Sequence, residues 1–232
     1  MAAHRHGGET GRVQSMIRVV VVDDEELVRS GFRLILQAAG DIEVVATATG
    51  AQAVREVGLH QPDVVLLDIR MPDVDGLTIL RQLRGLRRPP VVAMLTTFDS
   101  DEYIATALRS GAAGFILKDT GPDQLAQLVR TLAAGGVVLS PKVVRTVVDG
   151  YLDAGAGSAA AEQVGQLTER ERAVLVLIAD GLSNTDIGAR VHISVGTVKD
   201  HVSAILTKLG VGSRVQAALV AQRAGLLDGG RP

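Results

Sequence analysis

The chain has 232 residues, which is more than one average domain and favours two folding units. Hydrophobic residues make up 47% and charged residues 22% of the chain, which excludes a wholly disordered protein. The absence of cysteine excludes a disulfide scaffold and an iron–sulfur centre and indicates a reducing cytoplasm, while 2% aromatic residues argue against an aromatic-lined binding surface.

Charge and apolar residues are unevenly spread along the chain. Residues 167–232 carry 8 Lys and Arg against 6 Asp and Glu, whereas residues 1–166 carry 16 against 20. The C-terminal part is therefore slightly positive, as expected if it contacts phosphates, and the N-terminal part is slightly negative, as expected if it binds a cation. Residues 1–15 are almost free of apolar side chains, so we expect a disordered extension there, and no run approaches the ~18 apolar residues of a membrane span.

Residues 16–136 are predicted to alternate between strands and helices. Short apolar runs are typical of strands buried on both faces, and the segments between them have helical periodicity. Strands are expected at Ile17–Val22, Ile42–Ala48, Val64–Leu67, Val91–Leu95 and Phe115–Leu117, and helices at Glu26–Ala39, Ala51–Leu59, Leu77–Leu86, Glu102–Ser110 and Pro122–Ala134. This order predicts an α/β domain with a doubly wound, five-stranded parallel sheet and a ligand crevice at the carboxyl ends of its strands.

Polar residues follow these strands at their carboxyl ends. Asp23 and Asp24 follow the first strand, Asp68 the third, Thr96 the fourth and Lys118 the fifth. Three converging carboxylates repel one another unless a divalent cation lies among them, and Mg²⁺ suits such ligands. A hydroxyl and an ammonium group complete a site for a phosphoryl group, so Asp68 is the expected nucleophile that forms an acyl phosphate.

The same residues carry a family resemblance. The acidic pair at Asp23, the run from Asp68 through Ile-Arg-Met-Pro to Asp75–Gly76, Thr96, and Gly-Phe-Ile-Leu before Lys118 resemble the receiver domain of two-component response regulators. The resemblance covers the whole N-terminal domain and implies the flavodoxin-like fold. It also implies that a sensor histidine kinase phosphorylates Asp68.

The resemblance further implies individual roles for the residues of the pocket. Mg²⁺ would be held directly by Asp24 and Asp68, mostly through water by Asp23, and by the main-chain carbonyl of Arg70. The phosphate would be bound by Thr96 and Lys118. The switch would consist of a movement of Thr96 toward the phosphate and a rotation of the Phe115 ring. Arg70 and Phe98 are bulky residues at places that flank the path of the hydrolytic water in receivers. We therefore expect no enzymatic turnover beyond slow self-dephosphorylation.

The remaining chain is divided into a linker and a second domain. Residues 137–166 are rich in Gly, Ala and Ser towards their end and are predicted to be a linker. Residues 167–232 are predicted to form an all-α domain of four helices. Thr168 and Glu171 form a capping box, Ser183 and Ser194 begin the next two helices, and Gly210 ends the third. Two short helices joined by a tight turn are typical of a helix-turn-helix.

The C-terminal sequence resembles the DNA-binding domain of the LuxR-type helix-turn-helix, or NarL/FixJ, family. The matching strings are Leu-Thr-x-Arg-Glu from Leu167, Gly-Leu-Ser-Asn-x-Asp-Ile-Gly from Gly181, and Thr-Val-Lys-x-His-Val from Thr197. The resemblance implies that Ser194–Leu209 is the recognition helix. The candidate DNA-binding residues are Asn184, Thr185, Thr197, Lys199, His201, Ser203 and Lys208. Asp200 is acidic and lies in the middle of the expected DNA-binding face, where basic residues are expected. Dimerisation is expected, with Val215, Ala218, Leu219 and Gln222 as the candidate surface.

Together the two resemblances favour a cytoplasmic transcription regulator switched by phosphorylation, with a sensor histidine kinase, promoter DNA and a second copy of the chain as partners. Phosphate on Asp68 would permit dimerisation or release the recognition helix. Two alternatives stay open. One is a phosphohydrolase with an aspartate nucleophile, and the other is a DNA binder that another protein or a ligand controls without phosphate.

Overall fold

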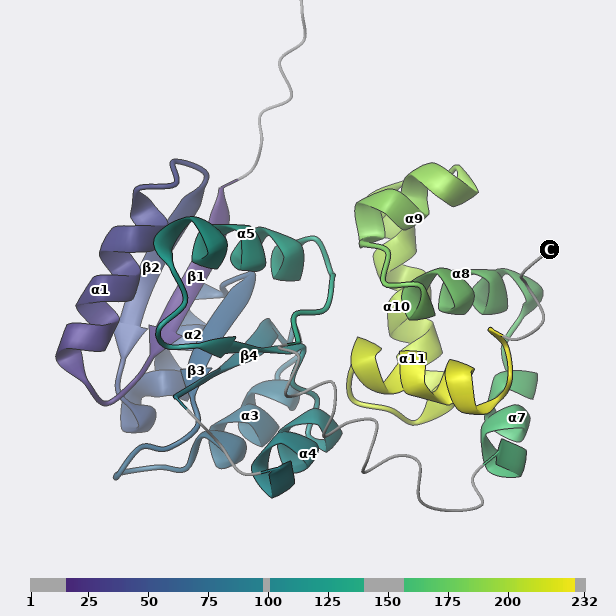
Figure 1. Cartoon of the computed structure of the whole chain (residues 1–232), viewed down its shortest axis with the longest axis horizontal. Coiled ribbons are helices and arrows are strands. Elements are labelled where there is room, and N and C mark those ends of the chain that lie inside the picture. The colour runs from purple at the N-terminus through teal and green to yellow at the C-terminus, as the bar shows by residue number, and fades with distance from the viewer. Residues whose placement is uncertain (1–15, 98–100, 140–156, 228–232) are drawn as a thin grey trace, which may run out of the picture.

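The computed structural model describes residues 16–97, 101–139 and 157–227, which form an α/β domain and a helical domain (Figure 1). The sheet of the first domain is parallel, with the strand order β2-β1-β3-β4-β5. Its strands are β1 (Ile17–Val22), β2 (Ile42–Ala48), β3 (Val64–Asp68), β4 (Val91–Thr96) and β5 (Gly114–Leu117). The predicted doubly wound sheet is confirmed, and its strand order is that of the flavodoxin-like fold.

Helices cover both faces of this sheet. They are α1 (Glu26–Gln37), the short 3₁₀ turn η1 (Gly50–Gln52), α2 (Ala53–His60), α3 (Gly76–Arg84), α4 (Asp101–Arg109) and α5 (Pro122–Ala133). Buried side chains of α1 and α5 pack on one face, and those of α2, α3 and α4 pack on the other. This alternation is what right-handed crossovers between parallel strands produce.

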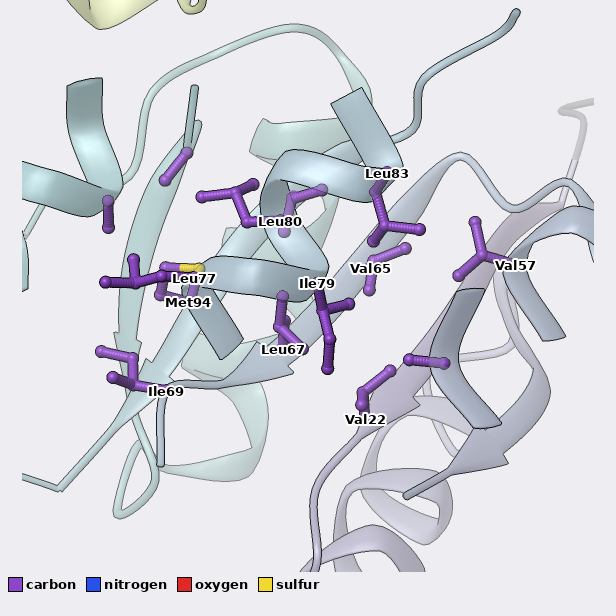
Figure 2. Close-up of a cluster of buried hydrophobic side chains, with 14 of the residues drawn as sticks. Val22, Val57, Val65, Leu67, Ile69, Leu77, Ile79, Leu80, Leu83 and Met94 are labelled. Atoms are coloured by element: carbon purple, nitrogen blue, oxygen red, sulfur yellow. The ribbon is translucent and has the colours of Figure 1, made fainter. Parts of the chain in front are cut away.

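The central strand β3 is buried on both faces, which explains its unbroken apolar sequence. Val65 and Leu67 join the cluster under α2, α3 and α4, where Figure 2 shows Val65 beside Leu83 and Leu67 beside Ile79, both of α3. Val64 and Leu66 belong to the opposite cluster. Each such side chain stabilises the fold by about 1.5–3 kcal/mol when fully buried. The dense packing fixes the strand ends, where the polar residues follow.

The N-terminal domain extends beyond residue 136. Val137 and Leu139 pack against the cluster under α2, α3 and α4, and Val138 lies in the opposite cluster. Val138 also bridges to Gly114 at the start of β5, where a side chain on the glycine would meet the Val138 carbonyl. The first residues of the predicted 137–166 linker therefore belong to the sheet domain.

The four helices predicted for residues 167–232 are all present in the described residues, and one further helix precedes them. They are α7 (Gly157–Gly165), α8 (Glu169–Ala179), α9 (Asn184–Val191), α10 (Val195–Leu209) and α11 (Arg214–Arg223). The additional helix α7 lies within the predicted linker. Its Ala160 and Val164 are buried in the core of this domain. The small residues that indicated a tether therefore serve as one face of a helix.

The predicted helix boundaries in this domain follow from side-chain caps. Thr168 and Glu171 form the reciprocal capping box at the start of α8. Ser183 and Ser194 cap α9 and α10 through the N–H groups three residues later. Gly210 ends α10 with φ of 66°, a left-handed backbone that glycine adopts readily. No helix in the three described ranges is long and apolar enough to cross a membrane.

The two domains touch through α11 and α9. Val215 of α11 is buried with the cluster that includes Ile104 and Leu108 of α4, and Leu219 packs against the same cluster. The N–H of Asn184, the first residue of α9, donates to the carbonyl of Ala134 after the end of α5 at 2.9 Å. The domains therefore form one closed arrangement in which the start of α9 lies against the end of α5 (Figure 1).

Candidate functional site

Three carboxylates converge at the carboxyl ends of β1 and β3. Asp23, Asp24 and Asp68 each offer a carboxylate oxygen, and these oxygens lie within 4.8 Å of one another. The ammonium group of Lys118, which follows β5, lies 2.8 Å from Oδ2 of Asp23 and 3.1 Å from Oδ2 of Asp68. The parallel sheet therefore assembles four residues that are as many as 95 positions apart in the chain.

Burial shifts the acid–base properties of this pocket. Asp23 is fully buried and Asp68 is 5% exposed. Burial and the neighbouring charge of Asp23 raise the pKa of Asp68 to about 6, against the lowering effect of Lys118 and the Arg70 N–H. Burial would lower the pKa of Lys118, but its hydrogen bonds and ion pairs with Asp23 and Asp68 outweigh burial and raise it. Lys118 is therefore a positive charge that partly neutralises the acids.

The loop after Asp68 is held by main-chain contacts. The N–H of Gly76 donates to the carbonyl of Ile69 at 3.0 Å, and a Cβ on Gly76 would lie 2.2 Å from the Asp68 carbonyl oxygen. Only glycine fits this approach, which explains the Asp75–Gly76 pair in the sequence. The carboxylate of Asp73 accepts from the N–H of Ala51 at 2.8 Å, so the same loop is tied to η1.

Thr96 and Phe115, two of the predicted switch residues, are buried in the sheet. Thr96 is the last residue of β4 and is 7% exposed, and Phe115 of β5 is 2% exposed within the apolar cluster under α4. The guanidinium of Arg70 lies 5.3 Å from the centre of the Tyr103 ring of α4. A cation–π contact therefore connects the loop of the acid pocket to α4, and the sequence reading did not anticipate it. Phe98 lies outside the described residues.

The pocket has the donor set that Mg²⁺ prefers. Its ligands are carboxylates on a rigid frame, and Oδ2 of Asp23 is buried with the ammonium group of Lys118 as its neighbour at 2.8 Å. Asp24 is exposed at the rim, which leaves an opening for water or a phosphoryl group. These residues fit a bound divalent cation.

The predicted DNA-binding residues divide into two groups. Thr185 of α9 and three residues of α10, namely Thr197, Lys199 and Ser203, are exposed, and His201 is half-buried. Lys199, Asp200 and Ser203 line a cleft of about 1220 Å³ between α10 and the N-terminal domain. Part of the predicted recognition face therefore looks toward the other domain in this arrangement.

Two candidates are engaged within the protein instead. Asn184 is 5% exposed, and its side-chain oxygen accepts from Nη1 of Arg214 at 2.8 Å while its N–H bonds to Ala134. Lys208 donates to both carboxylate oxygens of Glu171, at 2.9 and 2.7 Å. As arranged here, Asn184 is held by contacts within the protein and Lys208 stabilises the capping box of α8. The sequence does not distinguish these contacts from DNA contacts, because the N–H groups at a helix N-terminus and lysine side chains bind carbonyls and carboxylates as readily as phosphates.

The candidate dimer surface is partly covered. Val215 is buried and Leu219 packs against the N-terminal domain, whereas Ala218 packs within the helical domain and Gln222 is exposed. Dimerisation through all four residues would require the domains to separate.

Arg214 was not predicted to have a role. It is 8% exposed, and its guanidinium donates to Asn184 and to the carbonyl of Leu182. Burial lowers its pKa to about 10. Arg214 therefore fixes the start of α9, and a buried arginine could have been suspected only from its place directly after the Gly212–Ser213 helix start.

Comparison with known families agrees with both resemblances. Residues 19–130 match the response regulator receiver domain, and residues 165–221 match the bacterial regulatory proteins of the luxR family. The chain belongs to the response regulators that combine a receiver domain with a LuxR-type DNA-binding domain.

Individual relatives are similar over nearly their whole length. The transcriptional regulatory protein LnrK of Bacillus subtilis is 36% identical over 91% of this chain and 99% of that protein. The response regulator protein VraR of Staphylococcus aureus is 38% identical over 91% of this chain and 99% of that protein. Among solved structures, the response regulator ChrA of a heme-sensing two-component system is 34% identical, covers 91% of this chain and 99% of its own, and has a TM-score of 0.50.

Proposed function

We propose that this DNA-binding response regulator is switched by phosphorylation of Asp68. The observation that carries the proposal is the convergence of Asp23, Asp24 and Asp68 within 4.8 Å, with Lys118 bridging two of them. A carboxylate beside an ammonium group and two further acids is suited to accept a phosphoryl group and hold its charge. The phosphohydrolase alternative leaves the DNA-binding domain without a role.

The chemistry follows from the positions of the side chains. An oxygen of Asp68 attacks the phosphorus of a phosphohistidine on a sensor kinase, the P–N bond breaks, and the histidine leaves with a proton. Lys118 neutralises the negative charge that develops on the phosphoryl oxygens, and Thr96 offers its hydroxyl to them. Mg²⁺, held by Asp23, Asp24, Asp68 and the Arg70 carbonyl, would supply further charge neutralisation.

The closed arrangement suggests how the signal reaches DNA. In it Lys199 and Ser203 line the cleft against the N-terminal domain, and Val215 of α11 is buried there. We infer that phosphorylation shifts the molecule toward a form in which the domains separate, which releases α10 and exposes α11 for dimerisation. In the separated form, promoter DNA in the cytoplasm is contacted by Thr185, Thr197, Lys199, His201 and Ser203.

The phosphorylated state is proposed to be long-lived. Arg70, two residues after Asp68, is bulky and lies over the Tyr103 ring, and we expect it to restrict the access of a hydrolytic water to the phosphoryl group. Self-dephosphorylation is then slow, and the protein does not turn over phosphate esters as an enzyme does.

The test uses the full chain with Mg²⁺ and acetyl phosphate. The wild type is compared with Asp68→Asn and with Asp123→Asn, an exposed acid at the start of α5 that serves as the matched control. We expect wild type and control to gain the mass of one phosphoryl group and to bind promoter DNA more tightly, and Asp68→Asn to do neither. Equal DNA affinity of the wild type with and without acetyl phosphate, despite the mass gain, would overturn the switch.

A further inference from the structure

The cleft between the domains has an unusual distribution of charge. Its N-terminal wall carries Arg84, Arg87 and Arg88, and its C-terminal wall carries Lys199 of α10. None of these four side chains has an ion pair or hydrogen bond with another residue in the part of the chain that the structure describes. Cations on both walls repel each other across the cleft, so closure is unfavourable unless an anion lies between them.

Arg84 is the most constrained of the four cations. It is half-buried beside Gly111, where a Cβ on the glycine would lie 2.9 Å from both Arg84 Nε and the Gly212 carbonyl oxygen. Burial lowers its pKa, with no acid nearby to compensate. A partly desolvated guanidinium without a partner costs stability, and that cost would be offset by a bound anion.

The acids of the cleft do not neutralise this charge. The lining holds two acids, Asp63 and Asp200, against the four cations named above and Arg214, so positive charge is in excess. Apolar side chains line the rest of the cleft, among them Pro89, Val202 and Leu206. Cations with an apolar wall suit a molecule that carries both phosphates and an organic group, because arginine binds phosphate oxygens in pairs and the apolar wall covers a ring.

We propose that this interdomain cleft is a binding site for a small organic polyphosphate of the nucleotide class. Arg84, Arg87 and Arg88 bind its phosphates from one domain and Lys199 binds from the other. A ligand that contacts both walls binds only the closed form, so it stabilises that form and opposes DNA binding. The site is separate from the pocket around Asp68. Ligand binding is measured without phosphorylation or DNA, so its failure and failure of the proposed switch are distinguishable.

Titration calorimetry of the full chain tests the site, with adenosine triphosphate as the probe and a chelator present to keep Mg²⁺ out of the acid pocket. Inorganic triphosphate and adenosine are run as separate arms. We expect the nucleotide to bind more tightly than either part alone. The double variant Arg84→Gln with Arg88→Gln should weaken binding about tenfold or more, since each substitution removes a charged contact to the phosphates.

Two further variants control for non-specific effects. Arg81→Gln, on an exposed part of α3 outside the cleft, should leave the affinity for the nucleotide within about twofold. Lys199→Gln should weaken the binding of the nucleotide, because Lys199 supplies the contact from the C-terminal wall. The proposal is overturned if no arm binds, if Arg81→Gln and the double variant weaken binding equally, or if the double variant instead weakens DNA binding in the absence of nucleotide, which would assign these arginines to a DNA surface.

Discussion

At the scale of single residues, Asp68 determines how the acid pocket responds to pH. Its pKa of about 6 in the folded protein lies above the value of about 4 in an unfolded chain. The folded protein therefore binds this proton more tightly, and without metal its contribution makes the protein less stable as the pH rises from about 4 to about 6. Above that range the charged carboxylate is fully formed and ready for a cation.

This shift leads to a prediction for Mg²⁺. Mg²⁺ competes with the proton on Asp68, so its stabilising effect should be complete near pH 7.5 and should disappear as the pH falls through about 6. Melting temperatures with and without Mg²⁺ at several pH values measure this. Asp68→Asn should show a much smaller effect of Mg²⁺ at every pH. If Mg²⁺ raises the melting temperature of the wild type equally at pH 5 and pH 7.5, Asp68 is not the residue at which Mg²⁺ and the proton compete.

Two lysines of α10 should behave differently although they lie on the same helix. Lys208 pairs with buried Glu171, whereas Lys199 is exposed and has no ion pair or hydrogen bond among the described residues. Lys208→Ala should lower the free energy of unfolding by about 1 kcal/mol and affect the salt dependence of DNA binding little. Lys199→Ala should leave stability unchanged and reduce the salt slope of DNA binding by about one.

Urea denaturation followed by circular dichroism and DNA titrations at several salt concentrations separate the two effects. The contribution of the Lys208 pair depends on pH, because Lys208 and the capping contacts with Thr168 lower the pKa of Glu171. It should be present above about pH 4.3 and lost as the pH falls below the lowered pKa of Glu171. Loss of salt dependence in Lys208→Ala would return this lysine to the DNA surface.

At the scale of elements, the sequence predicted what repeats locally and missed what depends on packing between elements. The five strands and the caps of α8, α9 and α10 follow from apolar periodicity and short-range hydrogen bonds. Helix α7 was missed because its Gly, Ala and Ser residues have the composition of a tether, and only contacts of Ala160 and Val164 with the core make it a helix. The contacts of Asn184 with Ala134 and Arg214 likewise depend on packing between elements and could not be read from the sequence.

The contact between α9 and α5 can be tested by removing one donor. Asn184 is the first residue of α9, a position where proline is favoured, and Ser183 already has the extended backbone that precedes a proline. Asn184→Pro should therefore keep α9 but lose the hydrogen bond to Ala134. Asn184→Ala is the control, since it loses only the contact with Arg214. We expect unphosphorylated Asn184→Pro to bind promoter DNA more tightly than Asn184→Ala, and equal affinities would show that this contact does not restrain the domains.

At the scale of the whole molecule, the close approach of Gly111 and Gly212 reports on closure. A Cβ on Gly212 would lie 3.3 Å from Cα of Gly111, so the larger side chain of Gly212→Val should force the domains apart. Small-angle scattering should then give a larger radius of gyration, and DNA affinity without phosphorylation should rise about fivefold or more. Gly165→Val, which meets nothing within 4 Å, is the matched control.

If Gly212→Val opens the molecule without a gain in DNA affinity, closure does not inhibit binding.

The acid pocket could be predicted from the sequence because parallel strands bring their ends together whatever the loops do. The interdomain contact could not, because Val215 and Leu219 have the same pattern whether α11 packs on its own domain, on a second copy or on the N-terminal domain.

The hydrogen bond from Asn184 to Ala134 joins two main-chain groups. Every amino acid except proline supplies the same donor, so drift in side chains at these two positions would leave the bond in place. A restraint of this kind is invisible to residue conservation. Homologues with unrelated residues at both sites could hold their domains in the same way, and the comparison that reveals it is one of backbone geometry.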